Sequence, residues 1–454
     1  MLTASRPLAS PLLKLYLAAW AGYFVLLTVL PVSYSRLQAP LAVISLCLWI
    51  AISCVVAMIV EWLLGRARST ALRLPLSGGR PLSLTDLKRI IYFGMTLSVA
   101  GFLCLLYDRI FVQHIDFSQG IAVARELWRQ AGEDRSGVSS AFSVIGYLIG
   151  SAFFCSIAIA HLHWEIVPTA LRRLVTYGGL LLVMGNSLLT GGRSIILVQL
   201  AAVVAVAGIR KLHGLRGFPG RGLRTAAIGL AVLSLAIGYS VYVFGQRAIA
   251  GRTLPALYAD TEVAYLGGQP TPAYFAIDDL PSGISGFADL SVVAGMYLTH
   301  SYGTFEAVLE GGNLPGSATF IYVRELLAKL SLIPPANNDW VFQGLFLSLP
   351  GSLYYDFSWP GFYLGAVLLG LALGCVPALL IRTGGSGLFL SLGLLFVLCA
   401  LLAPLLLAID ILSVPFMVLG FILVDALNRM RGGGTNWLIV ADPVSLYEPV
   451  AKRQ

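Results

Sequence analysis

The sequence is poor in charge and in cysteine. Charged residues make up 11% of its 454 residues and hydrophobic residues 57%, whereas soluble domains carry about 25% charged residues. All six cysteines lie inside apolar stretches, which leaves no disulfide framework and no CxxC zinc site. The sequence also contains no P-loop, no HExxH motif and no GxGxxG motif before a helix. These absences exclude an ordinary soluble domain and leave nucleotide hydrolysis and zinc chemistry without support.

Long apolar runs dominate the sequence instead. A run of about 18 or more apolar residues is typical of a membrane-spanning helix. Ten charge-free runs fit or approach this pattern, at residues 12–30, 41–60, 90–107, 141–160, 174–189, 195–209, 226–244, 362–381, 388–407 and 411–424. The sequence therefore predicts an all-α polytopic membrane protein with about 10 (10–12) transmembrane helices.

Basic residues lie mainly on one side of the predicted membrane. With the N-terminus inside, the cytoplasmic segments hold 20 of the 30 Lys and Arg residues, as the positive-inside rule requires. The formal net charge of +8 then reflects anchoring at the membrane, and nucleic acid is not an expected partner. We expect both termini in the cytoplasm.

The predicted spans divide the chain into four parts. Residues 1–246 form an N-terminal bundle of about seven helices with an amphipathic outer segment at 108–140, and residues 247–359 form a large outer loop with short helices. Residues 360–428 add the C-terminal spans, and residues 429–454 form a cytoplasmic tail. The run 287–309 carries two acids and a histidine and is interpreted as an interfacial or re-entrant helix, because a full span disfavours such charges. If it did span, everything after it would change sides.

A Gly-Gly-Arg turn joins two short predicted spans. Gly191, Gly192 and Arg193 follow Thr190 directly, and glycines let a ligand approach the backbone where the next helix begins. The arms are shorter than the roughly 20 residues needed to cross a membrane, which places Arg193 below the outer surface. The turn therefore indicates an anion site. In the alternative interpretation, Arg193 snorkels to headgroups and the glycines only turn the chain.

Three further arginines lie at the outer side. Arg247 and Arg252 end a predicted span in the sequence GQRAIAGR, and Arg324 lies in the predicted short helix FIYVRELLAKL. Arginine clusters bind phosphate oxygens in a fork that lysine does not reproduce. The alternatives are stop-transfer anchoring and salt bridges with nearby acids.

A general base must take a proton from an attacking hydroxyl. The outer candidates are His300, Asp289, Glu306 and Asp356, and two of them, Asp356 and His300, are favoured. Asp356 lies in SLYYDFSWPGF, where Tyr354 and Tyr355 can contact sugar rings, and His300 lies in the stretch THSYG. In the alternative interpretation, Asp356 fixes the start of a helix and the aromatic residues form an interfacial belt.

Three windows carry a resemblance to a known family. They are DRIFVQHIDFSQGIAVARE at 108–126, TGGRSI at 190–195 and LYYDFSWPG at 353–361. Together with the ten spans and the large outer loop, which cover most of the chain, they resemble the oligosaccharide repeat unit polymerases, the Wzy-type or O-antigen polymerases. Ser358 stands where the family's aromatic-Asp-Phe-Gly pattern commonly has glycine.

The resemblance implies a GT-C-type glycosyltransferase of the bacterial inner membrane that needs no metal or other cofactor. Such an enzyme polymerises undecaprenyl-pyrophosphate-linked repeat units on the periplasmic side, with a chain-length regulator and a flippase as further partners. The arginines would then bind pyrophosphate, and Asp356 or His300 would be catalytic. An O-antigen ligase and a lipid-linked oligosaccharide flippase or other transporter are the competing interpretations.

Overall fold

Helices make up nearly all of the regular structure. The computed structural model describes residues 10–34, 39–70, 80–118, 120, 123–124, 126–128, 130, 138–190, 194–218, 223–251, 253–311, 318–319, 321–334, 346–383, 386–411, 413–432 and 435–440. Within this part of the chain, seven helices are long and apolar enough to cross a membrane: Pro11–Val29, Pro40–Leu64, Leu84–Val112, Ala141–Leu162, Ser194–Leu212, Leu349–Leu380 and Ser413–Met430. The prediction of an all-α polytopic membrane protein is confirmed at this level.

The first half of the chain forms the following elements. They are α1 (Pro11–Val29), β1 (Val32–Ser33), α2 (Ala39–Thr70), β2 (Arg80–Leu82), α3 (Leu84–Tyr107), the π-helix η1 (Asp108–Val112), α5 (Ala141–Gly150), α6 (Phe153–Leu162), α7 (Thr169–Arg173), the π-helix η2 (Leu174–Gly178), α8 (Gly179–Thr190), α9 (Ser194–Leu212) and α10 (Leu223–Ala250). Serine side chains begin several of them: Ser10 accepts a hydrogen bond from the Leu13 amide in α1, and Ser83 forms a capping box with Asp86 in α3.

The second half begins with the helices of the outer loop. Its elements are α11 (Pro255–Tyr265), β3 (Gln269–Pro270), α12 (Pro272–Phe275), α13 (Ser282–Gly311), α14 (Ile321–Lys329), α15 (Leu349–Thr383), α16 (Gly387–Leu402), the 3₁₀ helix η3 (Ala408–Asp410), α17 (Ser413–Gly432) and β4 (Thr435–Val440). The three predicted runs outside the seven candidate spans fall on η2 with α8, on α10 and on α16. Short helices in the outer loop were expected, but α13, with 30 residues, is as long as a span.

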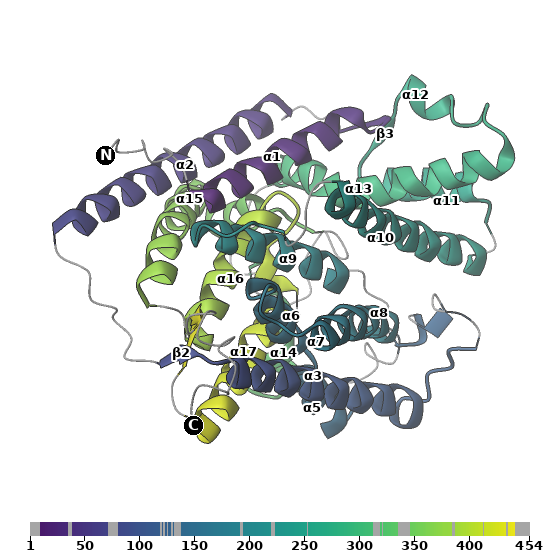
Figure 1. The fold of residues 1–454 in the computed structure, drawn as a ribbon. Coiled ribbons are helices and arrows are strands. Elements are labelled where there is room, and N and C mark those ends of the chain that lie inside the picture. The colour runs from purple at the N-terminus through teal and green to yellow at the C-terminus, as the bar shows by residue number, and fades with distance from the viewer. Residues whose placement is uncertain are drawn as a thin grey trace, which may run out of the picture.

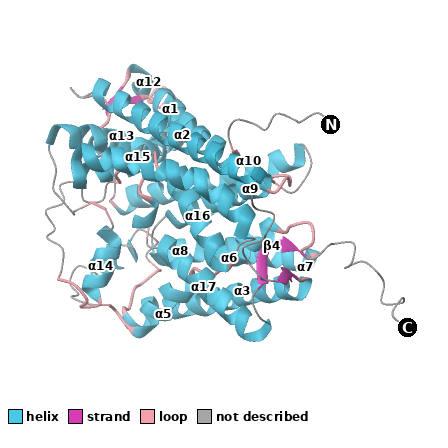
Figure 2. Ribbon diagram, turned by 90° about the vertical axis from the view of Figure 1, so that its left-hand side faces the viewer, coloured by secondary structure: helices cyan, strands magenta, loops and turns pink. Residues whose placement is uncertain are grey.

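The bundle has two distinct ends, which Figure 1 shows at left and right. At one end, β2 pairs in parallel with β4, and Figure 2 shows β4 beside α7. At the other end, β1 pairs with β3 and ties the end of α1 to the segment between α11 and α12. The second end is termed the outer end, in line with the charge distribution of the loops.

Helices α2 and α15 pack closely and in parallel. A Cβ atom on Gly370 would lie 2.6 Å from the Ser53 carbonyl oxygen, and one on Gly374 would lie 2.8 Å from that of Ala57. Small residues therefore allow the two backbones to approach, as is common between membrane helices. The contact moves from Ser53 to Ala57 along α2 as it moves from Gly370 to Gly374 along α15. The two helices therefore run through the bundle in the same direction.

Helix α15 is kinked near its start. Ser358 has φ 55° and ψ −157°, which divides α15 into a first part from Leu349 and a second part that packs on α2. Pro360 follows two residues later, and a proline inside a helix removes a hydrogen bond and clashes with the carbonyl four residues earlier. The residues before the kink contact α13 and the turn before α14.

Helix α13 enters the bundle from the outer end. Gly295 lies against Leu30 at the end of α1, while Ser301 bonds Tyr23, which lies seven residues earlier in α1 than Leu30. Helix α13 therefore runs antiparallel to α1, and its residues from Thr299 to Val308 are buried almost without interruption. Helix α13 is not among the seven candidate spans, and the interpretation of residues 287–309 as an interfacial or re-entrant helix stays a prediction.

Candidate functional site

The buried half of α13 meets the first part of α15, and this junction holds both predicted bases. His300 is 1% exposed. Its Nδ1 lies 3.1 Å from the Tyr297 carbonyl oxygen, and its Nε2 accepts a hydrogen bond from the Phe346 amide at 2.8 Å. This pattern requires the neutral tautomer with the proton on Nδ1. In the neutral state, both ring nitrogens of His300 are therefore hydrogen-bonded to backbone groups.

Asp356 holds a neighbouring turn. Its two carboxylate oxygens accept the amides of Ala318 at 2.9 Å and Thr319 at 2.6 Å. The side chain is buried, so these charge-assisted bonds are formed away from water and fix the approach to α14. Asp356 thus holds the turn before α14 rather than the start of its own helix, and its catalytic role stays a hypothesis.

The two predicted sugar-contacting tyrosines have different surroundings. Tyr354 is half-buried and its ring lies edge-on to Phe305 of α13, with centroids 6.2 Å apart. Tyr355 is buried in a small apolar cluster with Val308 and Leu347. Tyr354 also packs against Trp359, with centroids 4.9 Å apart. It is therefore the more exposed of the two tyrosines, while Tyr355 packs the junction.

Arg247 is connected to His300 by a row of aromatic rings. Its guanidinium lies 5.6 Å from the Phe244 ring centroid, Phe244 lies 4.9 Å from Tyr297, and Tyr297 lies 5.8 Å from His300. The Tyr297 hydroxyl donates to Glu262 at 3.0 Å. The structure thus brings one predicted phosphate ligand and one predicted base to the same side of α13.

The Tyr258 hydroxyl adds a polar group beside Arg247. Burial and the nearby Glu262 carboxylate raise the pKa of Tyr258, and the Arg247 charge opposes this shift. The hydroxyl therefore stays protonated at neutral pH. It lies close to the Arg247 guanidinium, so it can donate to an anion bound there.

Of the remaining predicted ligands, one is described. Arg324 is half-buried on α14, which begins two residues after the turn that Asp356 holds and packs against η3. Arg193, Gly191, Gly192 and Arg252 lie outside the described residues.

Sequence reasoning did not identify a buried ion pair at the start of η1. Asp108 accepts hydrogen bonds from Arg109, Ser139 and Ser140, and also from Gln113. The Arg109 guanidinium stacks on the Trp128 ring at 4.6 Å. The only sequence signal was that these residues begin the first resemblance window, and the structure shows that Asp108 fastens both ends of the outer segment.

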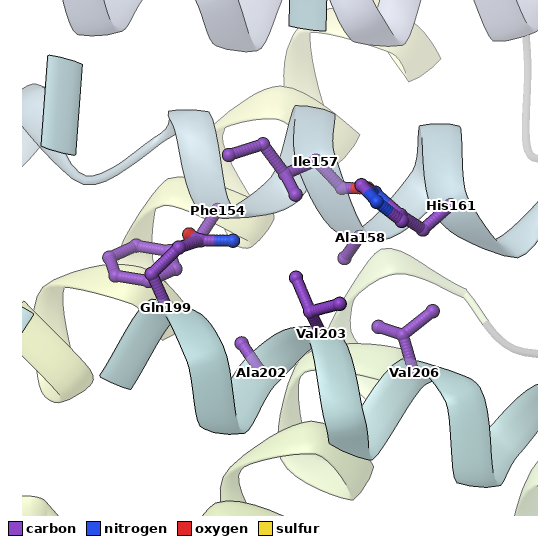
Figure 3. A pocket seen from close by; sticks show the side chains of 8 residues that line it. All are labelled: Phe154, Ile157, Ala158, His161, Gln199, Ala202, Val203 and Val206. Carbon is purple, nitrogen blue, oxygen red and sulfur yellow. The ribbon is translucent and has the colours of Figure 1, made fainter. Parts of the chain in front are cut away.

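A narrow apolar crevice lies between α6 and α9. Figure 3 shows Ile157, Ala158 and Val203 lining it, with Gln199 and His161 toward its two ends. Its empty space of about 170 Å³ is below the roughly 300–1,000 Å³ of small-molecule sites. The crevice is therefore too small for a lipid-linked sugar.

The described residues contain no group of three or more His, Cys, Asp or Glu side chains that could hold a metal ion. No protein family, no curated protein and no solved structure matches this chain.

Proposed function

We propose that this protein is a GT-C-type glycosyltransferase of the bacterial inner membrane. It polymerises undecaprenyl-pyrophosphate-linked oligosaccharide repeat units into a long surface or secreted polysaccharide on the periplasmic side. The observation that carries the proposal is the placement of Arg247, His300 and Asp356 around α13 and the start of α15.

The proposed chemistry needs an anion site and a proton acceptor. An acceptor hydroxyl attacks the anomeric carbon of the donor, a carbon–oxygen bond forms, and the bond to the lipid pyrophosphate breaks. The pyrophosphate leaves as an anion, which Arg247 and the Tyr258 hydroxyl stabilise. The hydroxyl proton passes to His300 Nε2 or to Asp356, and either acceptor must first release a backbone amide.

The test begins with deletion of the gene in its host. Surface and secreted glycans are run on a gel beside extracted lipid-linked intermediates. Loss of polymer with single repeat units still reaching the surface supports a polymerase. Long chains left on the lipid carrier indicate a ligase, and single units trapped on the cytoplasmic leaflet indicate a flippase.

Complementation then tests the site. Arg247→Ala should abolish long chains, and Arg247→Lys should restore little because lysine lacks the planar fork. Arg172→Ala is the matched control, since Arg172 bonds the Val167 carbonyl far from α13. Polymer of normal length from Arg247→Ala at normal protein level would refute the role of Arg247.

A transporter is the second candidate, because one observation favours it. Glu306 is fully buried on α13, close enough to Tyr302 and Tyr34 to act on both electrostatically. Buried acids and interrupted helices mark substrate pathways in transporters, and α15 is interrupted at Ser358. The lipid-intermediate assay separates this candidate from the polymerase.

A further inference from the structure

An exposed apolar row runs along α10. Leu235, Tyr242 and Ile249 are 68%, 52% and 69% exposed. Their spacing of seven residues places them on one face of the helix. Such a row on a long apolar helix is the surface that lipid chains cover in a bilayer.

The row continues past the end of α10. Leu254 and Leu257, at the start of α11, are 75% and 56% exposed, and Ile284 and Phe287 on α13 are 57% and 55% exposed. The two pairs adjoin, because a Cβ atom on Gly286 would lie 3.5 Å from the Pro255 ring. In Figure 1, α10, α11 and α13 extend side by side at the outer end.

Acidic groups accompany these apolar side chains. Asp260 follows Leu257 by three residues and is exposed on α11, whereas Asp289 lies more than half a turn from Phe287 around α13 and is buried. Tyr274 donates to Asp260 at 2.9 Å, and the charges of Asp260 and Asp278 act on Asp289. The segment from α11 to the start of α13, termed the outer arm, therefore combines exposed apolar side chains with acidic groups.

We infer that the outer arm lies in the outer leaflet of the membrane and that lipid acyl chains cover Leu254, Leu257, Ile284 and Phe287. Contiguous exposed apolar patches on soluble surfaces are costly and mark interaction sites. Here the patch continues the lipid-facing row of α10, so the same lipid layer covers both. An amphipathic segment buries its apolar face at the boundary of headgroups and acyl chains. This inference goes beyond the proposed function and holds whichever reaction the bundle performs.

Cysteine accessibility tests the inference. Leu257→Cys, Ile284→Cys and Phe287→Cys are purified, reconstituted into phosphatidylcholine liposomes and treated with a membrane-impermeant maleimide. Asp279→Cys is the matched control, because Asp279 is exposed between α12 and α13. Labelling after denaturation in SDS gives the total amount of reactive thiol in each variant. The unsubstituted protein gives the labelling that comes from its six native cysteines.

The three arm cysteines should react at least about tenfold more slowly than the control, because a thiol in lipid neither ionises nor meets the reagent. Each labelling rate is divided by the rate of the Asp279→Cys control. This ratio does not depend on the fraction of molecules inserted in the opposite direction. Reaction at the control rate would overturn the inference. Protection in host membranes together with free reaction in liposomes would also overturn it, since a protein partner would then be the occupant.

Discussion

We expect His163 to make the end of the bundle opposite the outer end sensitive to acid. It follows α6, and its Nε2 donates to the Trp437 carbonyl oxygen of β4 at 2.7 Å. Burial lowers the pKa of His163 to about 4; the bond to Trp437 and the Glu165 charge oppose this shift, while the charges of Arg210 and His213 add to it. The folded protein therefore holds His163 neutral at pH values where an unfolded chain protonates it.

The magnitude follows from linkage. The ordinary pKa of histidine is 6.5 and the folded value is about 4, and each unit of difference corresponds to about 1.4 kcal/mol. The stability contribution is fully present above pH 6.5 and is lost as the pH falls toward 4, because only the unfolded state takes up the proton in that window. The expected loss between pH 7 and pH 4.5 is roughly 2–3 kcal/mol.

The measurement is thermal unfolding in detergent between pH 4.5 and 7.5, followed by tryptophan fluorescence. The His163→Gln variant keeps a donor for Trp437 but does not titrate, so its stability should depend less on pH than that of the unsubstituted protein. His114→Gln is the control, because His114 is exposed at the outer end. Parallel pH curves for His163→Gln and the unsubstituted protein would refute the reasoning.

Three substitutions test other contacts by the same unfolding assay. Ser358→Gly should stabilise the protein by about 1 kcal/mol, because glycine adopts this backbone conformation without strain, and a lower midpoint would contradict this. Asp356→Asn should cost about 1–3 kcal/mol, because one carboxamide oxygen replaces two acceptors; full stability with loss of polymer would instead indicate catalysis. Asp108→Asn should cost about 3–5 kcal/mol by leaving Arg109 buried without its counter-ion, and an unchanged midpoint would show that Asp108 does not fasten the outer segment.

The membrane character could be predicted from sequence because it depends on local composition. Apolar runs such as 41–60 and 362–381 become helices whatever they pack against, since a span must satisfy its own backbone hydrogen bonds. Helix α13 is different. Its polar residues, including Thr299 and Glu306, lower its hydropathy, and contacts with α1, α2 and α15 bury them. The length and burial of α13 depend on tertiary contacts, which a hydropathy pattern does not reveal.

The candidate site could be predicted only in part. The aromatic surroundings of Asp356 and the apolar stretch around His300 marked both as unusual. Their partners are the amides of Ala318, Thr319 and Phe346, which lie 37 to 46 residues away in the chain and carry no motif. Backbone donors are the same for every residue type except proline, so sequence could not show that both side chains hold distant backbone segments.

Ser358 connects the family resemblance with the geometry. The third window departs from the aromatic-Asp-Phe-Gly pattern at this position, and its positive φ belongs to the region where glycine is favoured. A glycine at position 358 would adopt this backbone conformation without strain. Before the turn, Asp356 reaches the amide of Ala318; after it, Phe362 packs on Trp49 with ring centroids 5.2 Å apart. The backbone must therefore turn at residue 358, and serine adopts the required conformation with some strain.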